Sequence, residues 1–347
     1  MTLRRVAYTG ARSLAVETAG TPPLPAGHVR IDVAYTGICG TDLHVYHGAM
    51  DARVEPPGVI GHEMSGRIAE IGPDVTGWHV GEQVTVMPLV PCGQCPACSA
   101  GHDHICHRLV FLGIDATGSM QTSWTVPATT LVRLPADLRL DHAALVEPTA
   151  VAVHDVHRAD LRAGEKALVV GGGPIGLLIA IVAHRSGADV LLAEPDPYRR
   201  AVAEDVGLPT YDPSAEDGAG SIARWTGGAG AAVAFEVSGA QAGVGTAVEA
   251  LATRGRLVQV AIHPVPREIS LHRFFWRELT LVGARLYDRG DFETAVRLIA
   301  DGEIPAARLI SRIEPLERAA QAFEALEEGG GVMKVLIDCR ARGEDRR

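Results

Sequence analysis

The sequence predicts an α/β protein of two domains, one rich in β-strands and one built on a doubly wound parallel sheet. Up to about residue 150, short apolar segments are separated by glycine and proline, which is typical of strands joined by tight turns. From about residue 155, apolar strands alternate with helical patterns, which is typical of βαβ units. A chain of 347 residues is long enough to bury a core in each domain.

Composition and charge narrow the class of partner. The chain is 47% hydrophobic and 21% charged, as expected for a globular protein, and its formal net charge is -10. This charge argues against nucleic acid or an anionic membrane as a partner, so a small-molecule substrate is expected. The N-terminus lacks an apolar segment of signal-peptide length, and the longest apolar run, 177–183, is too short to cross a bilayer. We therefore expect a cytoplasmic protein with no membrane association.

Individual elements follow from the apolar pattern. The β-rich part should form a barrel or open β-sandwich with loops projecting inward. Its expected strands are 29–35, 66–71, 83–87, 123–126 and 130–134. The second part should contain strands 166–171, 189–194, 231–237, 256–261 and 279–283, with helices over 174–186 and 199–206. Two further helices, 292–300 and 316–326, precede a last strand over 332–339.

Four cysteines have the spacing of metal ligands. Cys92, Cys95, Cys98 and Cys106 are separated by two, two and seven residues. Thiolates on one short loop can surround a tetrahedral ion, so the spacing favours a closed, structural zinc site over disulfides in a reducing cytosol. An iron–sulfur cluster is the alternative, but its ferredoxin motif places the fourth cysteine after three residues and before proline. Here the fourth cysteine precedes His107.

A second group of candidate ligands is more dispersed. His62 and Glu63 lie side by side in the glycine-bracketed segment 61–66, and Cys39 lies upstream. A His-Glu pair alone is weak evidence, and a single cysteine is by default an inert buried thiol. Together they offer the three protein ligands that a catalytic zinc needs beside its open position.

Three neighbours of Cys39 have chemistry that suits such a site. An alcohol held on zinc must lose a proton, which the Thr41 hydroxyl can take and the His44 imidazole can pass to solvent. The alternative for His44 is an ordinary surface histidine. Asp42 is a candidate to orient His62.

A glycine-rich segment predicts a dinucleotide site. Gly171, Gly173 and Gly176 match G-x-G-x-x-G between an apolar strand and a helix that Pro174 and Ile175 open. The helix N-terminus offers free N–H groups to a pyrophosphate.

The residues after the second strand bear on the type of dinucleotide. Glu194 stands eighteen residues after Gly176, where its carboxylate can accept both ribose hydroxyls and repel a 2′-phosphate. NAD is therefore preferred over NADP, although Arg199 and Arg200 follow closely enough to bind a 2′-phosphate.

Together these motifs resemble the zinc-dependent medium-chain dehydrogenase/reductase superfamily, and the resemblance covers nearly the whole chain. It implies a GroES-like catalytic domain formed by residues 1–154 and 290–347, with a Rossmann NAD-binding domain of residues 155–289 inserted. The active site is implied to lie in the cleft, with two zinc ions per chain, one catalytic and one structural. The resemblance also implies a homodimer or homotetramer, paired through the edge of the Rossmann sheet near residues 279–287.

Glu147 points to one branch of the superfamily. Horse-liver-type alcohol dehydrogenases have a second zinc-binding cysteine where this chain has Glu147, whereas sorbitol and 2,3-butanediol dehydrogenases are similar in keeping glutamate. On this pattern Cys39, His62 and Glu63 bind the catalytic zinc, and Glu147 either coordinates it or holds a water molecule on it. A domain-interface salt bridge is the alternative role for Glu147. One departure is Trp124, where a Glu-Tyr pair is usual, and we interpret it as a packing residue beside a possible role in the substrate pocket.

The expected activity is the reversible oxidation of a secondary alcohol or polyol to a ketone, with hydride transfer to NAD. L-threonine 3-dehydrogenase or another amino-alcohol dehydrogenase is the nearest alternative, since such enzymes are similar at Thr41, His44 and segment 61–63 but carry Asp-Pro at the Glu147 position. A non-catalytic nucleotide-binding protein is the alternative of another class.

Overall fold

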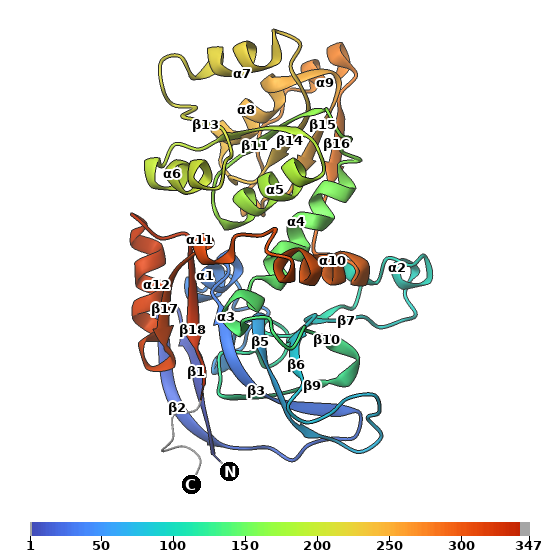
Figure 1. Cartoon of the computed structure of the whole chain (residues 1–347), viewed down its shortest axis with the longest axis vertical. Helices are drawn as coiled ribbons and strands as arrows, with labels where there is room; N and C mark the ends of the chain where they lie inside the picture. The colour runs from blue at the N-terminus through green and yellow to red at the C-terminus, as the bar shows by residue number, and fades with distance from the viewer. Residues whose placement is uncertain (1, 341–347) are drawn as a thin grey trace. The chain divides into compact units, whose positions relative to one another are not determined.

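The computed structural model describes residues 2–340, and the chain forms two compact units (Figure 1). Unit 1 comprises Met1–Glu147 and Asp288–Arg347, and unit 2 comprises Pro148–Tyr287. The boundaries expected from the sequence were 154/155 and 289/290. The fold class agrees with the prediction: unit 1 is rich in β-strands, and unit 2 is an α/β unit with a parallel sheet.

The strands of unit 1 form three sheets. The N-terminal strands are β1 (Thr2–Gly10), β2 (Ser13–Gly20), β3 (His28–Gly37), β4 (Gly58–Val59), β5 (Glu63–Ile71), β6 (Gln83–Val86), β7 (Leu89–Val90), β8 (Val110–Phe111), β9 (Ser123–Pro127) and β10 (Leu131–Arg133). The C-terminal segment adds β17 (Ile310–Pro315) and β18 (Lys334–Asp338). The largest sheet has the order β10-β6-β5-β3-β18-β17, with β9 also paired to β3, so the C-terminal strands β17 and β18 complete a sheet begun by β3.

Short helices connect these strands. They are α1 (Gly40–Tyr46), α2 (Pro96–Ser99), η1 (Asp103–Ile105), η2 (Ala128–Thr130), α3 (Leu140–Ala143), α10 (Arg289–Ala300), α11 (Ala306–Leu309), η3 (Leu316–Arg318) and α12 (Ala319–Glu328). The longer helix α4 (Val146–Arg158) runs through the boundary between the units. The core includes Ile31, Met64, Ile68 and Trp124, all fully buried.

Unit 2 alternates strands and helices as the sequence predicted. Its elements are β11 (Lys166–Val170), α5 (Pro174–Arg185), β12 (Asp189–Ala193), α6 (Pro197–Asp205), β13 (Thr210–Tyr211), α7 (Gly218–Thr226), β14 (Ala231–Glu236), α8 (Gln241–Ala250), β15 (Leu251–Gln259), α9 (Leu271–Arg277) and β16 (Thr280–Gly283). All strand pairs are parallel, in the order β13-β12-β11-β14-β15-β16. Leu168, Val170, Leu191, Ala234 and Leu257 lie in the core beneath α8.

The sequence missed several elements. The strands β1 and β2 have polar residues on both faces, and every residue of β2 is exposed or half-buried, so no alternating apolar face revealed them. Helix α4 was not expected across the predicted boundary, and β15 begins at Leu251 rather than at residue 256. The helix expected over 316–326 is divided into η3 and α12, and β17 was overlooked because its exposed polar residues interrupt the apolar pattern.

Among the described residues, none of the helices combines the length and the apolarity that a membrane crossing requires.

Candidate functional site

Two strands bring the dispersed candidate ligands together. Cys39 caps the N-terminus of α1 two residues after the end of β3, and His62 immediately precedes Glu63, the first residue of β5. Because β3 and β5 pair antiparallel with Gly37 opposite Glu63, the end of one strand meets the start of the other. The Cys39 sulfur, a His62 ring nitrogen and a Glu63 carboxylate oxygen lie within 4.8 Å of one another.

A buried lysine contacts the Glu63 carboxylate and was not anticipated from the sequence. Lys334 comes from β18, which also pairs with β3, and forms an ion pair with Glu63. The two side chains are only 3% and 1% exposed, and Lys334 Nζ also donates a hydrogen bond of 2.9 Å to the Ile38 carbonyl. Burial lowers the pKa of Lys334, but the Glu63 carboxylate raises it, and the net shift is upward. The available signal was a lysine directly before the apolar residues 335–337 of a short strand.

Gly37 leaves the space that the Glu63 side chain occupies. An added Cβ at Gly37 would lie 2.2 Å from Glu63 Oε2 and 3.0 Å from Lys334 Cε, so a larger residue would displace the carboxylate. Although the ammonium group is adjacent, neither Glu63 oxygen has a hydrogen bond of acceptable geometry within the described residues.

Asp42 lies beside His62, as the sequence suggested. Its Oδ2 accepts a 2.9 Å hydrogen bond from the Cys39 N–H, which fixes the carboxylate at the first turn of α1. Its Oδ1 is 3.7 Å from His62 Nδ1, beyond hydrogen-bond distance but close enough for a charge interaction. Burial lowers the pKa of His62, whereas the Asp42 carboxylate raises it, and the net shift is well upward. Phe111 packs edge-on against the imidazole.

The donor set fits a catalytic zinc ion. Cys39, His62 and Glu63 offer sulfur, nitrogen and oxygen, which are the ordinary ligand atoms of Zn²⁺ in sites that keep one position open. Both Glu63 oxygens are buried without a hydrogen-bond partner in the described part of the chain. Buried polar atoms of this kind are costly unless a ligand compensates them, so the cluster is suited to a cation.

The remaining predicted catalytic residues lie on helices α4 and α1. Glu147 is buried in the first turn of α4 and is not among the three clustered ligands, but its carboxylate raises the pKa of both His62 and Lys334. Thr41 and His44 are half-buried and stand three residues apart on α1, a spacing that puts them on one face of the helix.

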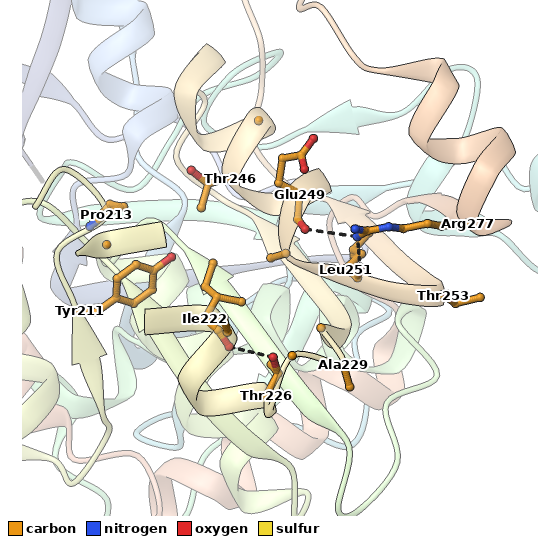
Figure 2. A pocket seen from close by; sticks show the side chains of 16 residues that line it. Tyr211, Pro213, Ile222, Thr226, Ala229, Thr246, Glu249, Leu251, Thr253 and Arg277 are labelled. Atoms are coloured by element: carbon orange, nitrogen blue, oxygen red, sulfur yellow. Dashed lines mark hydrogen bonds between the residues drawn. The ribbon is translucent and has the colours of Figure 1, made fainter. Parts of the chain in front are cut away.

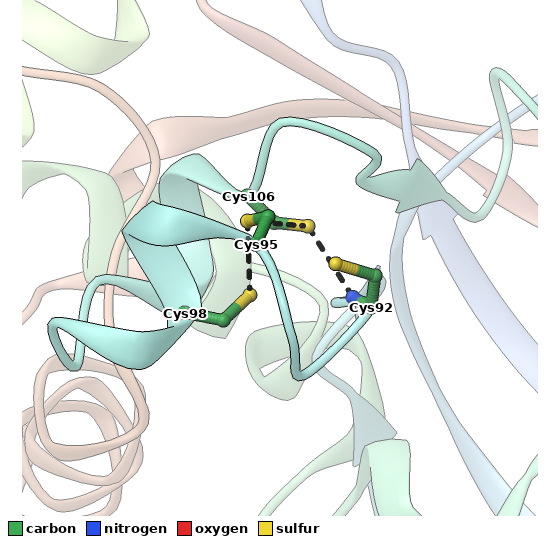
Figure 3. Close-up of side chains that lie close together, drawn as sticks. All are labelled: Cys92, Cys95, Cys98 and Cys106. Carbon is green, nitrogen blue, oxygen red and sulfur yellow. Dashed lines mark hydrogen bonds between the residues drawn. The ribbon is translucent and has the colours of Figure 1, made fainter.

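The four other cysteines converge in the loop between β7 and β8 (Figure 3). The Cys95 sulfur is 3.5 Å from the Cys98 sulfur and 3.8 Å from the Cys106 sulfur. Zn–S bonds in a tetrahedron require sulfur atoms about 3.8 Å apart, so these separations fit a zinc site with four thiolate ligands. The backbone N–H of Gln94 is the first cause that lowers the pKa of Cys92, to about 6. No disulfide joins any of the cysteines, all of which lie in the described region.

The glycine-rich segment forms the turn between β11 and α5. Gly173 caps α5, with Pro174 and Ile175 in its first turn, so the helix N-terminus faces out of the turn. An added Cβ at Gly176 would lie 1.8 Å from the Gly171 carbonyl oxygen, which only glycine avoids. Helix and strand therefore pack closely where a pyrophosphate is expected to bind.

Glu194 follows β12, next to this turn. Its Oε2 accepts a 2.6 Å hydrogen bond from the Gly172 N–H, and its Oε1 accepts one of 2.8 Å from Asp196. Arg199 Nη1 is 4.0 Å from Glu194 Oε2. Arg200 instead donates to the Glu194 and Pro195 carbonyls and lies 3.3 Å from Asp212, so its guanidinium has structural contacts.

Trp124 is buried within β9 and donates a 2.9 Å hydrogen bond to the Thr117 carbonyl. These contacts are those of a packing residue, which is the first of the two roles that the sequence suggested.

A separate pocket lies within unit 2, lined by residues of α7, α8 and the segments beside them (Figure 2). Arg277 crosses its rim and donates a 2.7 Å hydrogen bond to the Leu251 carbonyl, while the Thr226 hydroxyl donates one of 2.8 Å to the Ile222 carbonyl. None of the predicted metal, catalytic or dinucleotide residues lines this pocket, so it is distinct from the sites described above.

Comparison with known proteins identifies relatives along the whole chain. Residues 25–136 match the family described as alcohol dehydrogenase GroES-like domain, and residues 174–301 match the family described as zinc-binding dehydrogenase. The chain is 48% identical over 334 residues to 2-dehydro-3-deoxy-L-galactonate 5-dehydrogenase of Pseudoalteromonas atlantica, covering 96% of this chain and 98% of the relative. It is 35% identical to L-galactonate-5-dehydrogenase of Escherichia coli K12 over 305 residues, which cover 87% of this chain and 89% of the relative.

Solved structures give the same fold. The 2R,3R-butanediol dehydrogenase of Bacillus subtilis matches with a TM-score of 0.90 and 30% identity, covering 98% of this chain and all of the other. A matching structure from E. coli CFT073 is complexed with NADH; its TM-score is 0.90 at 26% identity, and the match covers 97% of this chain and 99% of the other. A structure from Sinorhizobium meliloti 1021 is bound to NADP; its TM-score is 0.91 at 30% identity, and the match covers 97% of this chain and 99% of the other.

Proposed function

We propose that the substrate is a six-carbon sugar acid oxidised at C5. The chain belongs to the zinc-dependent medium-chain dehydrogenase/reductase superfamily, and it oxidises a sugar-acid or polyol hydroxyl to a ketone. The observation that carries this proposal is the 48% identity to a 2-dehydro-3-deoxy-L-galactonate 5-dehydrogenase over 98% of that protein. A second relative, L-galactonate-5-dehydrogenase, oxidises the same carbon of a related acid according to its name.

We propose that unit 1 is the catalytic unit and that Cys39, His62 and Glu63 hold the catalytic zinc. When bound, zinc supplies a Lewis acid that polarises the alcohol oxygen and lowers its pKa. Asp42 holds the Cys39 segment and orients His62, while Lys334 balances the charge of Glu63. Glu147, whose carboxylate acts on the same residues, holds the zinc or a water molecule beside it.

Thr41 and His44 are proposed to carry the proton away from the alcohol. Their spacing on α1 puts the hydroxyl and the imidazole on one helix face, directly after Cys39. A hydroxyl next to the metal ligand can accept the proton, and a half-buried imidazole can pass it on to water.

Unit 2 is proposed to bind NAD in preference to NADP. Gly171, Gly173 and the first turn of α5, with Pro174, Ile175 and Gly176, receive the pyrophosphate, and the nicotinamide accepts the hydride. Glu194 faces the glycine turn with both oxygens accepting N–H groups, and its negative charge disfavours a 2′-phosphate. Arg199 is near enough to screen that charge only in part, and Arg200 is held by other partners.

A homodimer or homotetramer is proposed to form through the β16 edge of unit 2. In that unit Phe275 and Trp276 of α9 are 79% and 74% exposed, and Leu281 of the edge strand is also exposed. Exposed apolar side chains beside an unpaired strand edge are suited to a second copy of the same surface.

Initial rates with a substrate panel test the proposed function. The panel contains L-galactonate, 2-dehydro-3-deoxy-L-galactonate, sorbitol, 2,3-butanediol and L-threonine, each with NAD and with NADP. We expect the highest kcat/KM for a sugar acid with NAD, by at least tenfold over the neutral polyols. A preference for butanediol or sorbitol would refute the acid substrate while keeping the polyol activity. A preference for threonine would favour the amino-alcohol alternative.

A further inference from the structure

A buried carboxylate at the end of β14 organises the turn that follows it. Glu236 is the last residue of β14 and is completely buried. Its Oε1 accepts hydrogen bonds from the Ser238 N–H at 3.0 Å, the Gly239 N–H at 3.1 Å and the Ser238 hydroxyl at 2.5 Å. A single oxygen therefore fixes the turn over residues 237–239.

This turn lies against the glycine-rich loop. The Val237 N–H donates a 2.9 Å hydrogen bond to the Val170 carbonyl at the end of β11. Gly171 has a φ of +105°, and an added Cβ there would lie 2.9 Å from the Ser238 nitrogen and 3.0 Å from the Ser238 Cα. The position of Ser238 and the conformation of the first glycine of the loop are therefore mutually dependent.

The other oxygen of Glu236 contacts a histidine from the segment after β15. His263 Nε2 is 3.2 Å from Glu236 Oε2, and the His263 side chain is only 16% exposed. Arg267 Nε donates to His263 Nδ1 at 3.3 Å, and Arg267 Nη2 donates to the Gly239 carbonyl at 2.9 Å. Since arginine can only donate, the His263 Nδ1 accepts this hydrogen bond. The side-chain nitrogen of Gln259 lies 2.9 Å from His263 Nε2 and donates to the Ala261 carbonyl.

We propose that His263 is a positioning residue for the dinucleotide. It joins the segment after β15 to the Ser238 turn through Glu236, and the turn in turn holds the Gly171 loop. The strands β11, β14 and β15 are adjacent and parallel, so all three segments lie at the carboxyl edge of the sheet, where this fold binds its ligands. The inference rests on the proposed binding of NAD to unit 2 and adds a residue outside the glycine motif.

The test compares His263→Ala with the wild type in the full-length, zinc-loaded protein. We expect the Kd for NADH, measured by nicotinamide fluorescence titration, and the KM for NAD to rise about tenfold, with kcat within twofold and zinc content unchanged. Gln in place of His263 retains a donor for Glu236, so His263→Gln should recover most of the affinity. His184→Ala is the matched control, because His184 is an exposed residue of α5 in the same unit.

The inference is overturned if His263→Ala binds NADH with the same Kd as the wild type. A lower Tm without a change in Kd overturns it as well, since His263 would then have a structural role at most. If His263→Ala does not fold, Arg267→Ala serves instead, with an expected three- to fivefold rise in Kd, and an unchanged Kd overturns the inference. A wild-type protein that binds no NADH refutes the proposed function rather than this inference.

Discussion

The two groups of candidate zinc ligands in unit 1 are built in opposite ways. The four cysteines come from one loop, with no other element needed to assemble them, and two of them remain partly exposed. The Cys39, His62 and Glu63 cluster draws on separate segments of the chain and mixes sulfur, nitrogen and oxygen. His62 and Glu63 are buried together with Asp42 and Lys334, and Cys39 is half-buried. Four thiolates complete the coordination of a tetrahedral zinc ion, whereas the Cys39, His62 and Glu63 cluster offers only three ligands beside interacting buried charges. This contrast suits a structural role for one and a catalytic role for the other.

The largest expected effect comes from removing a ligand of the buried cluster. Cys39→Ser and Glu63→Ala should each lower kcat by at least about 10³-fold, because general acid–base groups alone contribute 10²–10⁴ and the Lewis acid is lost as well. Kd for NADH should remain within threefold, as the dinucleotide motifs lie in unit 2. Cys339→Ser is the matched control, because the sulfur of this buried residue lies near the carbonyl groups of Ser119 and Ile337 and belongs to neither cluster. Near-normal turnover in either ligand variant would refute the assignment.

Removing a ligand of the loop should chiefly affect stability. Cys95→Ser opens the four-cysteine site, and structural zinc contributes directly to folding, so we expect Tm to fall by about 10 °C or more. Differential scanning calorimetry with metal analysis measures both quantities. If the variant bound one zinc ion fewer than the wild type but had the same Tm, the loop would not be a structural site.

Lys334→Met tests whether the charges of the buried cluster depend on one another. Loss of the ammonium leaves the Glu63 carboxylate buried and unpaired, which costs about 3–5 kcal/mol in proteins. A bound zinc ion supplies the missing positive charge. The Tm of the variant should therefore fall further below that of the wild type in the presence of a chelator than in the presence of added zinc. Lys166→Met is the control, since the Lys166–Asp189 pair is half-exposed and contributes under about 1 kcal/mol in either condition. Equal losses with and without zinc would separate Lys334 from the metal.

The smallest effect concerns proton transfer, which only the buried cluster requires. His44→Gln should lower kcat about tenfold at neutral pH, because water can replace the outermost step of a proton relay at a slower rate. His102→Gln is the matched control, as His102 is an exposed residue of the cysteine loop. Identical pH–rate profiles of the His44 variant and the wild type would contradict the relay.

The sequence could predict those features whose residues lie close together along the chain. The Cys92–Cys106 loop, the Gly171 turn with Glu194, and the alternation of strands and helices in unit 2 were all visible, and the predicted dehydrogenase family, fold class and activity on a secondary hydroxyl are confirmed. Lys334 escaped notice because its partners are far away in the chain, as its bond to Ile38 over 296 residues illustrates. His263 was missed for the same reason, since its link to Glu236 exists only once two parallel strands are paired.

The place of β18 in the sheet has a consequence for biosynthesis. Unit 2 is a continuous segment that ends at Tyr287, so a ribosome has produced all of it before β18 emerges. The segments carrying Cys39, His62 and Glu63 are translated before unit 2, whereas Lys334, which pairs with Glu63, is translated after it. The ion pair between Lys334 and Glu63 can therefore form only after the whole of unit 2 has been translated.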